Sequence, residues 1–301
     1  MGRRKTAAVV LALVFSLFSL HVAYAAEGKK AEQLHYVTYQ TLPENAEALQ
    51  GEYIPVLMYH HFADRDMGSG DSMVVSKEEL EDHLRYFKSQ GYQVISLERL
   101  DTILKKVEHD HRLTGMGLGL GEKYICITMD DGYYSNYELA YPLFKEYRSP
   151  ASVFAVTDFI TDQYGLKKIT WEQARVMDAS GWLKVYSHSE DHVPVEAGQE
   201  EDFLSGMQKS EATLAENLTG THVKAMAYPN GQNTAESRRL LEEDGYVLQF
   251  TIKKGVITRE TDRTAIPRIT VESGMTGEDL IREIELAAEE AFAAEREGNE
   301  V

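Results

Sequence analysis

Cysteine, basic residues and long apolar runs are all scarce in this 301-residue sequence. A single cysteine, Cys126, excludes a disulfide within the chain, so an apolar core must supply the stability, and Cys126 itself is expected inside that core. Only 31 Lys and Arg residues stand against 49 Asp and Glu, which gives a net charge of −18. This acidity disfavours nucleic acid and anionic membrane surfaces as partners, whereas it is compatible with a neutral glycan.

The one apolar run of any length lies at the N-terminus, over residues 7–20. It follows the basic segment Arg3-Arg4-Lys5 and precedes Ala23-Tyr24-Ala25, which is the pattern of a secretory signal peptide over residues 1–26. The run is short for a membrane span, and an uncleaved anchor is the alternative. We therefore expect a secreted or cell-surface protein with no stable membrane insertion after cleavage. The mature net charge is then −21, because three basic residues and no acids are removed.

Residues 27–50 are polar and lack a sustained period, so we expect a linker or an N-terminal extension before a single domain over residues 51–301. In that domain short apolar strands alternate with amphipathic helices. The expected strands span residues 54–59, 92–96, 125–129, 151–156, 183–187, 223–228, 246–252 and 266–271. Such alternation predicts an α/β fold with a parallel sheet, and this number of strands favours a barrel over an open sheet.

The expected helices span residues 138–148, 171–179, 203–218 and 235–243, together with one helix that starts after Ser76 and one that starts after Thr276. Ser76 with Glu79, and Thr276 with Asp279, have the spacing of N-terminal capping boxes. Residues 109–121 contain alternating glycines and are expected to form a surface loop.

Two polar stretches directly follow expected strands and contain residue types that bind metals. The strand over residues 125–129 ends in Asp130-Asp131-Gly132, and two adjacent carboxylates at the end of a buried strand repel each other unless a cation lies nearby. The strand over residues 183–187 is followed by His188 and His192. Two imidazoles and one carboxylate would supply three ligands and leave room for water. The alternative is an ordinary Asp-Asp-Gly turn and an exposed histidine pair.

These two stretches, followed by Tyr228-Pro229-Asn230-Gly231, resemble the first three motifs of the polysaccharide deacetylases, carbohydrate esterase family 4 with its NodB-homology domain. The segment over residues 54–62 is similar to the branch that contains the poly-N-acetylglucosamine deacetylases. The resemblance extends from about residue 52 to about residue 272. It implies a distorted (β/α)7 barrel and hydrolytic N-deacetylation of N-acetylglucosamine units in an extracellular or cell-wall polysaccharide.

Residue by residue, the resemblance implies that Asp131, His188 and His192 bind a divalent metal, which we expect to be zinc. It also implies that Asp130 is the general base. A metal held in this way lowers the pKa of a bound water to ~7 and polarises a carbonyl group. The residues themselves agree, since the ends of the strands are where barrels carry their chemistry.

The third motif departs from the family pattern, because Ala227 stands at an arginine position and Asn230 at a tyrosine position. The family uses the backbone N–H of that tyrosine position to hold the oxyanion, and a backbone donor survives the change to Asn230. We expect Arg268 to replace the missing arginine beside Asp130. The alternative for Arg268 is a surface or structural ion pair.

The general acid also departs from the family pattern, because no histidine follows His222. His60 and His61 follow the strand over residues 54–59, and side chains alternate along a strand, so only one of them is expected to point inward. We favour His60 as the acid. The alternatives are a structural role for His60 and a mechanism in which Asp130 carries the proton twice.

Two other classes of function remain open. One is a non-catalytic glycan-binding protein on the same fold. The other is a glycoside hydrolase, for which the adjacent Asp130 and Asp131 are poorly suited, because the two catalytic carboxyls must lie at least ~5 Å apart on either side of a sugar bond. In either case the expected partner is a polysaccharide, and the protein is expected to be a monomer.

Overall fold

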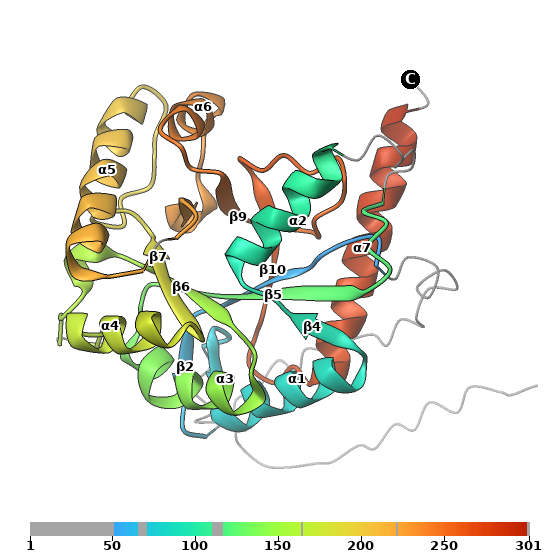
Figure 1. Cartoon of the computed structure of the whole chain (residues 1–301), viewed down its shortest axis with the longest axis horizontal. Helices are drawn as coiled ribbons and strands as arrows, with labels where there is room; N and C mark the ends of the chain where they lie inside the picture. The colour runs from blue at the N-terminus through green and yellow to red at the C-terminus, as the bar shows by residue number, and fades with distance from the viewer. Residues whose placement is uncertain (1–50, 66–70, 110–116, 164, 221, 300–301) are drawn as a thin grey trace, which may run out of the picture. The chain divides into compact units, whose positions relative to one another are not determined.

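The structure is a computed structural model and describes residues 51–65, 71–109, 117–163, 165–220 and 222–299 (Figure 1). The expected signal peptide (residues 1–26) and the expected linker (residues 27–50) lie outside the described residues, so both remain predictions.

The described residues form a parallel sheet of eight strands at the centre of the fold (Figure 1). The strands are β1 Val56–Tyr59, β4 Tyr92–Val94, β5 Lys123–Asp130, β6 Ala151–Ala155, β7 Leu183–Ser187, β8 Ala225–Ala227, β9 Leu248–Lys254 and β10 Ile266–Thr270. Their order is β1-β10-β9-β8-β7-β6-β5-β4, and β1 also pairs with β5. All the strands except β4 therefore form a ring, and β4 lies outside it against β5.

The ring is irregular. Only the pair Ser187–Met226 joins β7 to β8, and the register between β9 and β10 shifts at Ile266 and Arg268. This architecture confirms the expected α/β fold and is consistent with a distorted (β/α)7 barrel.

Helices surround the ring on the outside (Figure 1). They are α1 Lys77–Ser89, α3 Tyr141–Tyr147, α4 Trp171–Ser180, α5 Glu200–Asn217, α6 Ala235–Glu243 and α7 Gly277–Asn299. The capping box at Ser76 is confirmed, because Ser76 Oγ accepts from the Glu79 N–H and the Glu79 side chain accepts from the Ser76 N–H. Thr276 and Asp279 make the same reciprocal pair at the start of α7.

A helix that was not among the expected elements, α2 (Leu97–His109), closes the N-terminal end of the barrel. Its apolar stripe packs against residues that point into the barrel from the strands, including Val56, Cys126, Phe154 and Phe250. Cys126 is fully buried in this cluster, as expected of a core residue. With one end filled by α2, the C-terminal ends of the strands are left as the open face of the barrel.

Three further elements near the C-terminal ends of the strands were not expected. Two short parallel strands, β2 (His61–Ala63) and β3 (Val74–Ser76), form a small separate sheet. The segment η2 (Asn136–Ala140) is a π-helix that precedes α3. Asn136 is fully buried, and its Nδ2 donates to the His60 carbonyl over 2.9 Å. The β1–β2 junction is therefore held against the segment that follows Asp131.

Alternation along the strands decides which side chains enter the barrel. On β5, Ile127 and Met129 pack outward with the helices, whereas Thr128 and Asp130 lie on the opposite face. On β1, Val56 packs into the barrel and Tyr59 packs outward, so the alternation turns His60 inward.

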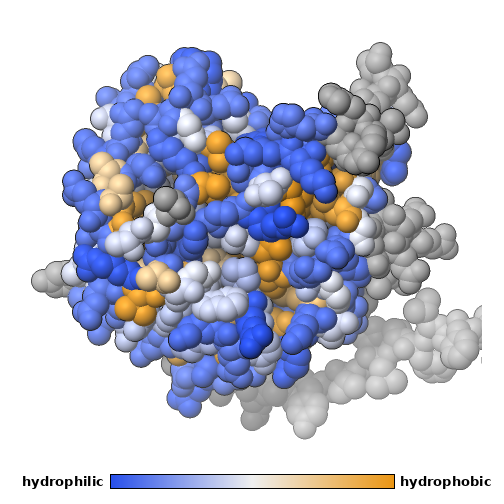
Figure 2. Space-filling view, in the orientation of Figure 1, coloured by the Kyte–Doolittle hydropathy of each residue, from blue (hydrophilic) through white to orange (hydrophobic). Residues whose placement is uncertain are grey.

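Hydrophilic residues cover most of the face seen in Figure 2, and hydrophobic residues show there only in small separate groups. Among the described residues, no helix combines the length and the apolarity that crossing a membrane requires.

A network of charged side chains ties α2 and α4 to the strands at the N-terminal end of the barrel. Glu98 on α2 accepts from Lys184 Nζ at 2.9 Å and from the Tyr186 hydroxyl at 2.6 Å, both on β7. Asp178 on α4 lies 3.0 Å from His222 Nε2. Burial lowers the pKa of His222, but the neighbouring carboxylates of Asp178 and Glu98 more than offset this and raise the pKa to about 9.

His222 predicts a loss of stability at alkaline pH. The folded-state pKa lies above the ordinary value of 6.5, so the contribution of His222 is complete below that pH and is lost as the pH rises through about 9. We expect the wild type to lose ~1–2 kcal/mol relative to His222→Asn over this range, discounted because the network is partly exposed to solvent. Urea unfolding from about pH 6 to about pH 10 measures this difference in the free energy of unfolding. His109→Asn, at an exposed histidine, should follow the wild type. Parallel wild-type and His222→Asn profiles would contradict the account.

Candidate metal centre and active site

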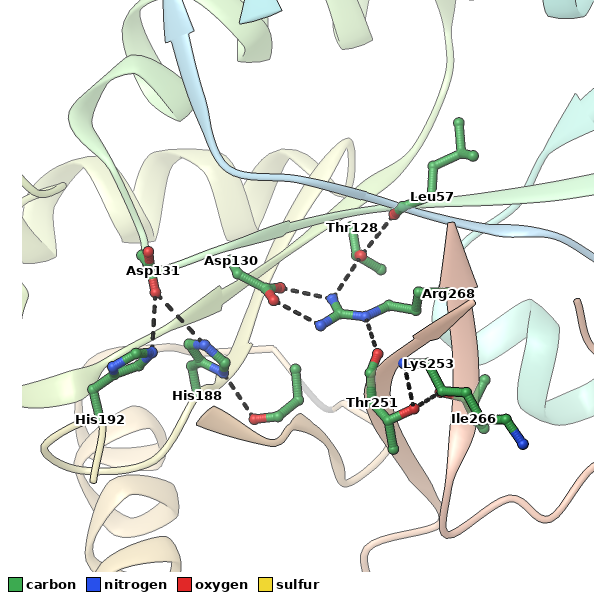
Figure 3. Close-up of polar contacts among 11 residues, drawn as sticks. Leu57, Thr128, Asp130, Asp131, His188, His192, Thr251, Lys253, Ile266 and Arg268 are labelled. Carbon is green, nitrogen blue, oxygen red and sulfur yellow. Dashed lines mark hydrogen bonds and ion pairs between the residues drawn. The ribbon is translucent and has the colours of Figure 1, made fainter. Parts of the chain in front are cut away.

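Three side chains with metal-binding groups meet at the C-terminal ends of β5 and β7 (Figure 3). Asp131 directly follows β5, and His188 and His192 lie in the segment after β7. Asp131 Oδ1 lies 3.6 Å from His188 Nε2 and 3.4 Å from His192 Nε2. Among the described residues, this is the only group of three or more His, Cys, Asp or Glu side chains that could hold a metal ion.

The environment of His188 selects the form that binds metals. His188 is buried, and its Nδ1 lies 2.8 Å from the Ala227 carbonyl, which can only accept a hydrogen bond. Nδ1 therefore carries the proton, and the lone pair of Nε2 faces Asp131. Burial lowers the pKa of His188, and the charges of Asp130 and Asp131 offset this in part. The neutral imidazole is thus favoured.

The backbone at this edge of the barrel is strained in several places. Asp131, Ser189, His192 and Asn230 have φ values of 70°, 73°, 63° and 54°. They make up four of the six non-glycine residues with positive φ in the part of the chain that the structure describes. Such a conformation disfavours residues with a Cβ and persists only where the surroundings impose it. The strain therefore concentrates on the segments that carry the expected site.

The geometry of the three donors fits a divalent metal. Two ligands that lie ~2.0–2.1 Å from a tetrahedral ion are ~3.3 Å apart. The two Asp131–histidine separations of 3.4 and 3.6 Å are close to that spacing. Two imidazoles and one carboxylate, with a fourth position open to water, form the donor set of a catalytic zinc site.

Asp130 turns its carboxylate toward Arg268 and forms a buried ion pair with it (Figure 3). Arg268 Nη1 and Nη2 donate to Asp130 Oδ1 and Oδ2, each over 2.7 Å. Arg268 is fully buried and also donates to Thr128 Oγ1 and to the Thr251 carbonyl. The structure thus places Arg268 beside Asp130, where the sequence analysis expected a cation, and its burial excludes the surface ion pair.

The pair keeps Asp130 ionised. Burial raises the pKa of Asp130, but the charge of Arg268, followed by that of His188 and the hydrogen bonds from Arg268, lowers it to about 2. Because each carboxylate oxygen has two lone pairs, both oxygens can still accept a further hydrogen bond.

The structure also brings His60 to this edge of the barrel. His60 lies close enough to Asp130 for its charge to help lower the pKa of Asp130. Asn230 lies in the turn η4 (Pro229–Gly231) that follows β8, and its side chain is exposed. The expected residues Asp130, Asp131, His60, His188, His192, Asn230 and Arg268 therefore all lie at or near the C-terminal ends of the strands.

Lys168 and His61, which were given no site role from the sequence, lie against the ring of Tyr133, which directly follows the Asp131-Gly132 turn. Lys168 Nζ lies 3.5 Å from the centre of the Tyr133 ring, and the His61 ring lies 5.1 Å from it, edge to face. Burial raises the pKa of Tyr133, and the charge of Asp131 raises it further. Tyr133 stands directly after the Asp-Asp-Gly turn in the sequence and was one of several aromatic residues considered as a surface for a sugar ring, whereas no local signal marks Lys168.

The chain matches a protein family model and several curated proteins. The family model described as polysaccharide deacetylase matches residues 118–248. The protein YxkH from Bacillus subtilis, whose name assigns it to the polysaccharide deacetylases, is 30% identical over 224 residues, which cover 74% of this chain and 73% of YxkH. A poly-beta-1,6-N-acetyl-D-glucosamine N-deacetylase from Staphylococcus epidermidis is 26% identical over 219 residues, 69% of this chain and 71% of that protein.

Solved structures share the fold. The deacetylase PplD from Streptococcus pyogenes, in complex with acetate, superposes with a TM-score of 0.66 at 22% identity and covers 77% of this chain and 98% of PplD. IcaB from Ammonifex degensii gives a TM-score of 0.64 at 24% identity, and the superposition covers 77% of this chain and 97% of IcaB. At these identities the likeness shows the fold alone.

The buried pair predicts a large stability cost for losing Arg268. Arg268→Met leaves Asp130 buried without a cation, and breaking a buried pair costs ~3–5 kcal/mol. Urea unfolding at neutral pH measures the loss. The matched control is Arg239→Met, since Arg239 pairs with Glu236 and Glu243 at the exposed surface and should matter little. If the two variants were equally stable, Arg268 would not support Asp130 as described.

Proposed function

The chain belongs to the polysaccharide deacetylase family, and we propose that it is a metal-dependent hydrolase that removes acetyl groups from N-acetylglucosamine units of an extracellular or cell-wall polysaccharide. The observation that carries the proposal is the meeting of Asp131, His188 and His192 next to the buried Asp130–Arg268 pair. The choice of sugar is supported by the relative from Staphylococcus epidermidis, whose name states that substrate.

We assign the metal to Asp131 Oδ1 and to the Nε2 atoms of His188 and His192, with zinc as the ion that this donor set suits best. When bound, such an ion supplies Lewis acidity and lowers the pKa of a coordinated water to ~7. The hydrogen bond from His188 Nδ1 to the Ala227 carbonyl orients one ligand, in the way that outer partners fix metal-binding histidines elsewhere.

Asp130 is the proton acceptor in this proposal. Its carboxylate is ionised at neutral pH and is held in one orientation by the two hydrogen bonds from Arg268. The remaining lone pairs of its oxygens can take a proton from the attacking water. Arg268 is a positioning residue here, because it acts only through Asp130.

Two further groups complete the reaction. The backbone N–H of Asn230 would donate to the oxygen that gains negative charge as the acetyl carbon becomes tetrahedral. The departing nitrogen needs a proton, since an amide anion is too basic to leave. His60, turned inward at the end of β1, is the candidate donor, and return of the proton from Asp130 is the alternative.

We also propose that the protein is exported, with cleavage near residue 26, and acts as a monomer. The N-terminal charge and hydropathy pattern supports export. N-terminal sequencing of protein from the medium or the cell surface tests the cleavage, and retention of residues 1–26 would contradict it.

The reaction itself is tested with a panel of acetylated glucosamine oligomers analysed by mass spectrometry. We expect loss of acetyl groups with no change in chain length. Binding without acetyl loss would instead show a non-catalytic glycan-binding protein, and new reducing ends would show a glycoside hydrolase.

Asp130→Asn separates the base from the metal ligands. Because Asp130 is assigned to proton transfer, the variant should keep its metal and lose turnover by ~10²–10⁴. Metal content by mass spectrometry and acetate release are measured on the same sample. Asp131→Asn is the matched comparison and should lose metal. Loss of metal from Asp130→Asn would make Asp130 a ligand instead.

His60→Ala tests the general acid. An acid must be protonated to act, so its loss should remove the basic limb of the kcat/KM profile against pH while metal content stays the same. His109→Ala, at an exposed histidine on α2, is the control for the removal of an imidazole. If the profile of His60→Ala matched the wild type, Asp130 would be left as the carrier of both protons.

A further inference from the structure

A groove of about 510 Å³ lies at the C-terminal edge of the barrel, on the side of β2 and the segment that follows Asp131. Its volume falls within the ~300–1,000 Å³ of ordinary small-molecule sites. Its polar and aromatic lining comes from three segments, which are β2, the residues at the start of η2 and the loop before α4. The lining residues include His61, Tyr134, Glu138, Leu166 and Lys167.

The groove adjoins the metal-binding group through Tyr133. His61 lines the groove, and its ring lies 5.1 Å from that of Tyr133, whose pKa is raised by burial and then by the charge of Asp131. Backbone hydrogen bonds join the two segments beneath it, from Tyr134 N to the Lys167 carbonyl at 2.8 Å and from Ile169 N to the Gly132 carbonyl at 2.9 Å. The groove is therefore built on the same turn that presents Asp131.

The groove combines apolar surface with both hydrogen-bond donors and hydrogen-bond acceptors. Leu166 is a large apolar residue with 56% of its surface exposed, and Tyr134 adds part of an aromatic ring. Glu138 and Lys167 are exposed beside them, so the groove offers acceptors and donors. A sugar ring needs this combination, because it presents apolar C–H faces and a rim of hydroxyl groups.

We propose that this groove binds the sugar unit next to the one being deacetylated, an inference that rests on the proposed function. The apolar face of a neighbouring N-acetylglucosamine unit packs on Leu166 and Tyr134, and its hydroxyl and acetamido groups bond to Glu138 and Lys167. The enzyme then holds its substrate by two adjacent units.

A second cleft offers the polymer a rival path. It is larger, about 800 Å³, lies between β9 and α7, and borders the site at Gly231, next to Asn230. Ile252, 50% exposed, lines this cleft as Leu166 lines the groove. The groove is preferred because its lining residue His61 packs on the ring of Tyr133, which directly follows the Asp131-Gly132 turn.

The test is binding of N-acetylglucosamine pentasaccharides, β-1,6-linked and β-1,4-linked, to variants made in the Asp130→Asn background. Leu166→Ser probes the groove, and Ile252→Ser probes the rival cleft. Val176→Ser on α4 is the matched control, because Val176 is 46% exposed and lines neither. Loss of one apolar contact with the sugar should raise the Kd of the better-bound oligomer about five- to tenfold in Leu166→Ser. The Kd values of Ile252→Ser and Val176→Ser should match that of the Asp130→Asn parent.

Thermal unfolding checks that the exposed substitutions leave the fold intact. An unchanged Kd in Leu166→Ser, an effect confined to Ile252→Ser, or no binding of either pentasaccharide to the parent would overturn the inference. Because binding is measured in a background made inactive, the result stands apart from acetate release by the wild type, which tests the proposed function.

Discussion

The buried pair between Arg268 and Asp130 is the interaction on which the geometry of the site depends. Two adjacent carboxylates at the end of a buried strand would repel each other, and strand geometry separates them by turning Asp130 into the barrel. There Arg268 binds both of its oxygens. Asp131 is left at the rim, where it faces His188 and His192. Asp130 is thus fixed in its charged form, and the neighbouring Asp131 is free to bind the proposed metal.

That pair in turn depends on how the ring of strands is joined. β1 lies between β10, which carries Arg268, and β5, which carries Asp130. Thr128 bridges the three strands, because its hydroxyl donates to the Leu57 carbonyl and accepts from Arg268 (Figure 3). The helix α2 fills the opposite end of the barrel, so the chemistry is confined to one face.

Much of this could be predicted from the sequence, because the signals are local. Short stretches of residues are enough to identify the strand before Asp130, the histidine pair after β7 and the capping boxes. Arg268 could be predicted because a buried acid required a cation and the strand over residues 266–271 supplied one. The helix α2 was missed although its apolar stripe is a local signal. That it closes one end of the barrel could not be predicted, because this depends on tertiary packing. Lys168 could not be found, since it reaches Tyr133 only through the pairing of two loops distant in sequence.

The central claim is that Asp131, His188 and His192 form one metal centre, and zinc titration of the metal-free protein tests it most directly. Calorimetry should show one zinc ion bound per wild-type chain. His188→Ala should weaken binding by more than ~100-fold, beyond the upper end of what loss of an outer partner costs. His109→Ala, an exposed histidine outside the site, should bind as the wild type does. Equal zinc affinity in His188→Ala and the wild type would contradict the account.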